Sequence, residues 1–319
     1  LKGEMDNHGC SSRSRNNENW GWYLFSSLRY RPTQRKPHNM DLLTKDRDIH
    51  VLPLQFENTA KEQSIYLLSD VHFDSVKCDR KLFFKHLDMA KEEGAVVFIL
   101  GDLYDLMQMR FDPRGDYASL RPELKATAYI DEVIKDCTTK LEPYKDIIKL
   151  ISMGNHETNI TKRHGIDTIQ RTVGVLNAMG GNMVAGYYAG WVILKCETNG
   201  GRRRSFPLHY HHGYGGNAKR SKGVLNVDID MKDYPQAHII ARGHTHQKWY
   251  HPVMRDVLSA QFQHVQETVH VVQTGSYKKK DRSIGWEVEK GFSVPRLGGW
   301  KFTIKPFGNN YDIQCHELH

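Results

Sequence analysis

The sequence predicts an α/β protein in which two β-sheets pack together and helices cover the outside. Apolar, β-branched runs of strand length recur along the chain, as at residues 96–100, which is typical of strands buried on both faces. In the first half of the chain these strand-like runs alternate with helical patterns, and in the second half most patterns are those of strands. With 319 residues, 39% of them hydrophobic, one large domain is favoured over two.

The first half of the chain alternates strand and helix patterns. The helix at 81–93 is the clearest, because Phe83, Phe84, Leu87 and Ala90 fall on one face. Two further helices are expected at 122–141 and 166–179, and strands at 49–56, 64–69, 95–100 and 146–153. Residues 107–120 contain a proline and a glycine and are expected to form an irregular insertion.

The second half reads mainly as strands. A turn of glycine and arginine residues at 199–204 separates two of them. The expected strands are 183–197, 205–211, 238–241, 268–273 and 300–305.

The predicted catalytic domain covers residues 47–305, preceded by a polar, basic and partly disordered arm (1–46) and followed by a short tail (306–319). Four aromatic residues interrupt the arm. We favour their docking on the protein's own surface over stacking on bases or contact with another chain. They are Trp20, Trp22, Tyr23 and Phe25.

Composition narrows the class of protein. No apolar run approaches the roughly 20 residues that span a bilayer, and no signal pattern opens the sequence, so we expect a cytoplasmic protein without a membrane partner. Five scattered cysteines without a CxxC pair are expected to be reduced thiols. The net charge of +8 favours a phosphate-bearing partner but does not by itself indicate nucleic acid.

Five predicted strands end in short motifs that carry metal-ligating side chains. Mixed carboxylate, amide and imidazole ligands suit divalent manganese, iron, zinc or nickel. Pairs spaced i, i+2 share a face where the backbone is extended. The candidate ligands are Asp70, His72, Asp102, Asn155, His212, His244 and His246.

In this order the motifs resemble the five signatures of the calcineurin-like metallophosphoesterases, over about residues 64 to 246. The matching stretches are Asp70-x-His72, Gly101-Asp102-x-x-Asp105, Gly154-Asn155-His156-Glu157, His212-Gly213 and Gly243-His244-x-His246. The resemblance implies a four-layer α/β/β/α sandwich of two mixed β-sheets flanked by helices. It also implies two divalent metal ions, for which manganese is favoured and iron, zinc or nickel are alternatives.

The resemblance assigns a role to each residue. One metal would be held by Asp70, His72 and His246. The second would be held by Asn155, His212 and His244. Asp102 would bridge both, and His156 would protonate the leaving oxygen or stabilise the developing charge, with the Asp105 carboxylate orienting it.

Such a centre would hydrolyse a phosphoester by in-line attack. Two metals about 3.5–4 Å apart can hold a bridging hydroxide at neutral pH. One assignment has a competitor, because His211 stands beside His212. The family pattern places the ligand directly before glycine, which favours His212, and His209 is expected to be a packed residue.

Departures from the patterns of individual subfamilies reduce the number of possible substrate classes. Asp105 is followed by Leu106 and Met107 instead of Arg-Gly, which disfavours a protein phosphatase. The tyrosine ligand of purple acid phosphatases would stand three residues after Asp102, where Asp105 stands. The leading hypothesis is a phosphodiesterase acting on DNA, RNA or a nucleotide, of the DNA-repair exonuclease-like branch. The alternatives are a phosphomonoesterase for a small metabolite and a non-catalytic scaffold.

Basic residues near the predicted site could bind substrate phosphate. Lys219, Arg220 and Lys222 follow a glycine-rich stretch just after His212, and either a phosphate cradle or a solvated basic loop fits them. The runs 202–204 and 278–280 are expected to be solvated turns.

Overall fold

The structure is a computed structural model that describes residues 40–107, 120–124, 128–215, 222–259, 261–280, 283, 286–289, 291, 294, 296–308 and 310–319. The residues after Lys36 belong to one compact unit, Pro37–His319, which is described below. The aromatic residues of the predicted arm lie outside the described residues.

The first sheet has six strands in the order β13-β12-β3-β4-β5-β6. Its parallel core is β3 (Gln63–Leu68), β4 (Val96–Leu100), β5 (Ile148–Ser152) and β6 (Val184–Gly186). Two antiparallel strands complete it, β12 (Trp300–Phe307) and β13 (Asn310–Glu317). Parallel strands direct their carboxyl ends to one edge, where ligands bind in open α/β sheets.

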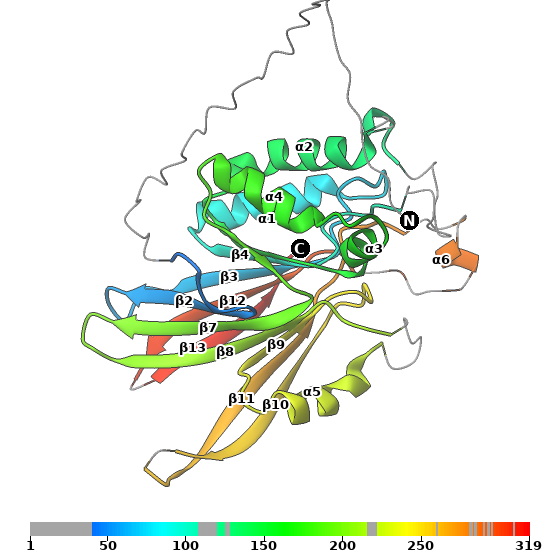
Figure 1. The fold of residues 1–319 in the computed structure, drawn as a ribbon. Helices are drawn as coiled ribbons and strands as arrows, with labels where there is room; N and C mark the ends of the chain where they lie inside the picture. The colour runs from blue at the N-terminus through cyan, green and yellow to red at the C-terminus, as the bar shows by residue number, and fades with distance from the viewer. Residues whose placement is uncertain are drawn as a thin grey trace, which may run out of the picture. The chain divides into compact units, whose positions relative to one another are not determined.

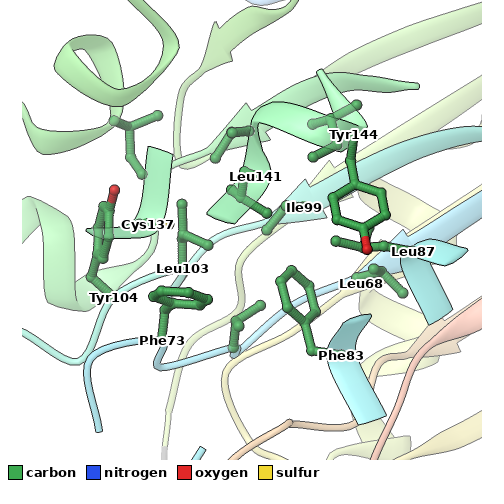
Figure 2. Close-up of a cluster of buried hydrophobic side chains, with 14 of the residues drawn as sticks. Leu68, Phe73, Phe83, Leu87, Ile99, Leu103, Tyr104, Cys137, Leu141 and Tyr144 are labelled. Carbon is green, nitrogen blue, oxygen red and sulfur yellow. The ribbon is translucent and has the colours of Figure 1, made fainter. Parts of the chain in front are cut away.

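Helices cover the outer face of this sheet, as Figure 1 shows for α1 (Arg80–Glu92), α2 (Tyr129–Leu141) and α4 (Thr168–Ala178). Apolar side chains of α1 and α2 meet those of β3 and β4 in a buried cluster (Figure 2). Val97 and Ile99 face the helices, whereas Phe98 faces the other sheet. The alternation explains why the β4 sequence is apolar throughout.

The second sheet has seven strands in the order β1-β2-β7-β8-β9-β11-β10. They are β1 (Leu43–Asp46), β2 (Ile49–Phe56), β7 (Ala189–Thr198), β8 (Arg203–His211), β9 (Ile239–Arg242), β11 (His264–Gln273) and β10 (Trp249–Leu258). Leu52, Leu194 and Leu208 pack against Phe98 and Phe302 of the first sheet. Helix α5 (Val227–Asp233) packs on the outer side of this sheet. The predicted four-layer α/β/β/α sandwich is therefore confirmed (Figure 1).

The predicted strand 183–197 is in fact two strands, β6 and β7, which belong to different sheets. The chain crosses between the sheets at residues 187–188. A Cβ at Gly186 or Gly190 would lie 2.8 or 2.6 Å from the Tyr210 hydroxyl oxygen, so glycine leaves room for that ring at the crossing. A hydrophobic pattern alone gives no sign of such a change of sheet.

The predicted tail is also wrong, because residues 310–317 form β13 along the whole of β12. Tyr311 is buried there, and the Lys248 Nζ atom donates to the Leu318 carbonyl at 2.7 Å. At the other end, β1 and an ion pair between Asp41 and Lys149 (3.0 Å) extend the folded part ahead of residue 47.

Several helices differ from the prediction. The expected helix 122–141 is a short 3₁₀ turn (Pro122–Leu124) followed by α2. The sequence interpretation did not include α3 (Asn155–His164), α5 or the four-residue α6 (Trp286–Glu289). The insertion at 107–120 lies mostly outside the described residues. Within the described ranges, no helix has both the length and the apolar character needed to cross a bilayer.

Candidate metal centre

The seven predicted ligands follow the carboxyl ends of five strands, six of them on loops and Asn155 as the first residue of α3. Those after β3, β4 and β5 come from the six-stranded sheet, and those after β8 and β9 come from the seven-stranded sheet. The structure brings six of the seven into two groups whose ligand atoms lie within 4.8 Å of one another, and Asn155 contacts the second group. Each group takes side chains from both sheets.

The first group is Asp70, His72 and His246. The His246 Nε2 atom lies 3.3 Å from Asp70 Oδ1 and 3.3 Å from His72 Nε2. Asp70 and His72 are almost completely buried, and His246 is partly exposed. One carboxylate and two imidazoles therefore face a single point that solvent can reach.

The second group is Asp102, His212 and His244. The Asn155 Oδ1 atom joins it, at 3.1 Å from His212 Nε2 and 2.7 Å from His244 Nδ1. Asp102 Oδ2 lies 3.1 Å from His212 Nε2. A third overlapping group contains His72, Asp102 and His156, so Asp102 lies between the two positions.

The hydrogen bonds of the two imidazoles in the second group test whether a cation fits there. His212 Nδ1 donates to the Leu100 carbonyl at 3.0 Å, and His244 Nε2 donates to the Gly215 carbonyl at 3.0 Å. When a ring is neutral, its other nitrogen turns a lone pair toward the Asn155 amide oxygen. Several acceptors that face one another require positive charge between them, so the donor set fits a divalent metal.

The electrostatics of His212 support the same conclusion. Burial disfavours the charged imidazole, but the Asp102 and Asp70 carboxylates and the Leu100 carbonyl together outweigh burial and raise the pKa of His212 to about 10. The Asp102 pKa is held well below its ordinary value, because the histidines around it outweigh the effect of burial. The pocket thus strongly favours positive charge beside Asp102.

Five of the seven candidate ligands have a left-handed backbone that non-glycine residues seldom adopt. The φ angles are 51° at Asp70, 51° at His72, 50° at Asp102, 77° at His244 and 56° at His246. Backbone hydrogen bonds hold the first two loops together, from His72 N to the Asp102 carbonyl (3.1 Å) and from Asp70 N to the Gly101 carbonyl (3.0 Å). The strain is concentrated where the ligands are presented.

Two glycines of the motifs allow the loops to approach closely. A Cβ at Gly101, where φ is +83°, would lie 2.4 Å from His212 Nδ1. A Cβ at Gly154 would lie 2.1 Å from Asp102 Oδ1. Any side chain at either position would therefore displace a candidate ligand.

Glu157 is a further residue of the site, and the sequence interpretation gave it no role. Its carboxylate is buried and accepts the backbone amides of Asp102 (3.2 Å), Tyr104 (3.0 Å) and Gly154 (2.8 Å). Burial and then the Asp102 carboxylate raise its pKa to about 8, although these amides favour the charged form. Its place three residues after the helix N-cap, as in a capping box, was the available signal.

His156 and Asp105 are both buried at the site, but their contact differs from the prediction. His156 Nδ1 donates to the backbone carbonyl of Asp105, and its Nε2 lies 3.7 Å from Asp102 Oδ2. The Asp105 carboxylate lies 4.0 Å from His156 Nδ1, whereas it lies 2.8 Å from His72 Nδ1 and 2.7 Å from Lys278 Nζ. The main chain of Asp105 therefore orients His156, and its carboxylate contacts a metal-ligand candidate.

The three neighbouring histidines of β8 have different surroundings. His212 alone of the three lies in a group that could hold a metal. His211 accepts the Gly213 amide at 2.8 Å and packs against Tyr188 and Tyr214. His209 stacks on Tyr234, with ring centroids 3.6 Å apart.

The predicted phosphate-binding residues are only partly described. Lys219 and Arg220 lie outside the described residues. Lys222 is exposed, has a φ of 49°, and its carbonyl accepts the Trp249 indole N–H at 2.9 Å. Lys278, which was expected in a solvated turn, instead reaches the buried Asp105 carboxylate.

Comparison with known proteins identifies the family of the chain. The model of the calcineurin-like phosphoesterase family matches residues 64–248, which is more than half of the chain. The chain belongs to this family. Membership supports, as its general class, a metal-binding hydrolase of phosphoric esters that acts on phosphoester substrates.

Solved structures with a similar backbone include the calcineurin-like phosphoesterase YfkN from Bacillus subtilis, at 11% identity and a TM-score of 0.36, covering 81% of this chain and 91% of that one. GAP50, described as the anchor in the inner membrane complex of Plasmodium, has 10% identity and a TM-score of 0.37, covering 81% and 88%. Vacuolar protein sorting 29 from Cryptosporidium parvum has 10% identity and a TM-score of 0.35, covering 80% and 97%. A search of curated protein sequences gave no match.

Proposed function

We propose that the protein is a binuclear metal-dependent phosphodiesterase that acts on nucleic acid or a nucleotide. The observation that supports this most is the presence of two ligand groups linked by a third, which shares His72 with the first and Asp102 with the second. The site formed by the two groups and Asn155 is the proposed metal centre. Its donors are two carboxylates, one amide and four imidazoles, which suit manganese best and also iron, zinc or nickel. The net charge of +8 favours an anionic, phosphate-rich substrate.

In this proposal Asp70, His72 and His246 would hold one cation, and Asn155, His212 and His244 would hold the other. Asp102 would be shared by the two positions. When bound, the cations neutralise the phosphoryl oxygens and activate water for in-line attack.

The proton for the leaving oxygen comes from His156. Its Nδ1–H is engaged by the Asp105 carbonyl, and its Nε2 faces the Asp102 side of the site. Proton donation of this kind contributes about 10²–10⁴-fold to a rate.

The test compares hydrolysis of bis(p-nitrophenyl) phosphate with that of p-nitrophenyl phosphate in manganese, nickel, zinc and magnesium. Single- and double-stranded DNA, RNA and cyclic nucleotides complete the panel. We expect the diester to be the better substrate. Preference for the monoester would instead indicate a phosphomonoesterase for a small metabolite.

Two variants and one control accompany this panel. Asp102→Asn should reduce turnover to background, and His156→Ala should reduce kcat by about 10²–10⁴-fold. His251→Ala, an exposed histidine of β10, is the matched control and should leave turnover unchanged. Normal turnover in both site variants would overturn the proposal. Near-zero metal occupancy in protein purified without chelator would favour a non-catalytic scaffold.

A further inference from the structure

A segment beyond the family match takes part in the metal centre. The match ends at residue 248, yet residues 274–279, which follow β11, run alongside the loop that carries Asp70. The Tyr277 amide and the Ser276 hydroxyl both donate to the Asp70 carbonyl, each at 2.9 Å. The strained turn at Asp70 is thus supported from this segment.

The same segment also brings Lys278 close to the first ligand group. The Lys278 amide donates to the Ser276 hydroxyl oxygen at 2.9 Å, and the Lys278 backbone forms an isolated antiparallel β-bridge with that of Cys78. Its Nζ lies 2.7 Å from Asp105 Oδ1, and its side chain is only 13% exposed. The Asp105 Oδ1 atom also lies 2.8 Å from His72 Nδ1. Lysine, carboxylate and imidazole therefore form a buried chain that ends on a candidate ligand.

We infer that Lys278 is a positioning residue, whose ammonium group fixes the Asp105 carboxylate and thereby holds His72 with its Nε2 toward the metal position. This inference rests on the proposed metal centre. A carboxylate behind a metal-ligating histidine sets the tautomer and the ring orientation. At Asp105 one oxygen serves both neighbours, so its position depends on both.

Without the Lys278 ammonium group, the buried Asp105 carboxylate would keep the neutral His72 imidazole as its nearest partner among the contacts given above. A buried carboxylate without a compensating cation is costly, and its side chain can turn toward His156, whose Nδ1 is 4.0 Å away. In either case His72 loses its fixed orientation. The second ligand group, around His212 and His244, does not depend on this chain.

The test is Mn²⁺ binding to the full chain after chelator treatment, followed by calorimetry and by electron paramagnetic resonance. Wild type should bind two ions with a spin-coupled spectrum. Lys278→Gln should weaken one of the two sites by about 10–100-fold, the usual effect of losing an outer partner, and leave a single-ion spectrum at limiting Mn²⁺. Lys278→Arg, which keeps the cation, should restore most of the affinity.

Lys279→Gln is the matched control, because Lys279 is a neighbouring lysine that is 59% exposed and pairs with Asp79. It should bind manganese like wild type. Two full-affinity sites in Lys278→Gln would overturn the inference, whereas a wild-type protein that binds no manganese would overturn the metal centre itself.

A double-mutant cycle separates positioning from a general loss of stability. Asp105→Asn should weaken the same site, and adding Lys278→Gln to it should cause no further loss, because the lysine acts through that carboxylate. Additive losses would contradict the inference. If Lys278→Gln does not fold, Asp105→Asn and Lys278→Arg still give the answer, since the first must weaken the site and the second must spare it.

Discussion

The loops around Asp102 and the ribbon formed by β10 and β11 are opposite kinds of structure in one molecule. The loops bury carboxylates and imidazoles, and Asp70, Asp102 and Glu157 are each 2% exposed or less. The ribbon exposes large apolar side chains, with Leu258 71% and Phe262 87% exposed. Burial thus follows the partners that each position offers more closely than it follows the polarity of the side chain.

The contrast has a structural cause. In the loops, backbone amides and carbonyls from different strands meet each polar side chain, so every contact depends on several segments. The ribbon pairs with β9 at His270–Gln273. Farther out, Glu267 forms an ion pair with Arg204 of β8 and Arg255 donates to the Pro235 carbonyl, and beyond these two residues the described contacts of the ribbon are those between β10 and β11 (Figure 1). A change in the loops should therefore spread, whereas a change in the ribbon should stay local.

Removing metal should have the largest effect. Chelator treatment should abolish phosphodiesterase activity and lower the Tm, because a ligand present at 100 times its Kd stabilises the folded state by about 2.7 kcal/mol. Differential scanning calorimetry and rate measurements before and after adding Mn²⁺ back would check this. Full activity in protein shown by mass spectrometry to be metal-free would refute it.

Gly154→Ala should have the next largest effect, because its Cβ would lie 2.1 Å from Asp102 Oδ1. We expect kcat/KM to fall by about a hundredfold, the scale reported for small misplacements of catalytic groups. Gly174→Ala is the control. Among the described atoms none lies within 4 Å of its added Cβ, so this change in α4 should stabilise by about 0.5–1 kcal/mol. Equal effects of the two substitutions on kcat/KM would show that the contact of the added Cβ with Asp102 is not the cause of the loss.

Glu157→Gln should have a moderate effect. Oε1 accepts the Tyr104 amide and Oε2 accepts those of Asp102 and Gly154, and the amide nitrogen of glutamine cannot accept, so at least one of these three backbone amides would lose its acceptor. The expected loss is about 1–3 kcal/mol in the free energy of unfolding, measured by urea titration. A variant as stable as wild type would show that these amides are not what holds the loops.

Phe262→Ser in the ribbon should have the smallest effect. An exposed substitution away from packed features changes stability by about 0.5 kcal/mol or less, and turnover should match wild type. The same urea titration and rate assay check both. A large loss of stability or activity would show that the ribbon is not independent of the site, and the comparison of the two regions would fail.

The sequence was most informative where a pattern is repeated and local. The strand β4 and the helix α1 follow directly from an apolar run and a helical stripe. The seven candidate ligands could be found because each stands next to a glycine or at fixed spacing after a strand. Their convergence on two groups follows from parallel strands that end at one edge.

Other features depend on contacts between distant segments. Lys278 lies 173 positions after Asp105, and nothing in its local sequence distinguishes it from Lys279 beside it. Strand β13 forms because it pairs with β12, and its short, polar sequence does not by itself predict a strand. The change of sheet between β6 and β7 is set by the space that Tyr210 needs.

The origin of the ligands on two sheets has a mechanical consequence. Asp70 and His72 belong to the six-stranded sheet and His246 to the seven-stranded sheet, and the second group is divided in the same way. A bound ion is therefore a cross-link between two layers that otherwise adhere through apolar side chains and through hydrogen bonds such as that from His212 Nδ1 to the Leu100 carbonyl. Sliding of one sheet over the other would require a coordination bond to break, so each ion should also slow the unfolding of the sandwich.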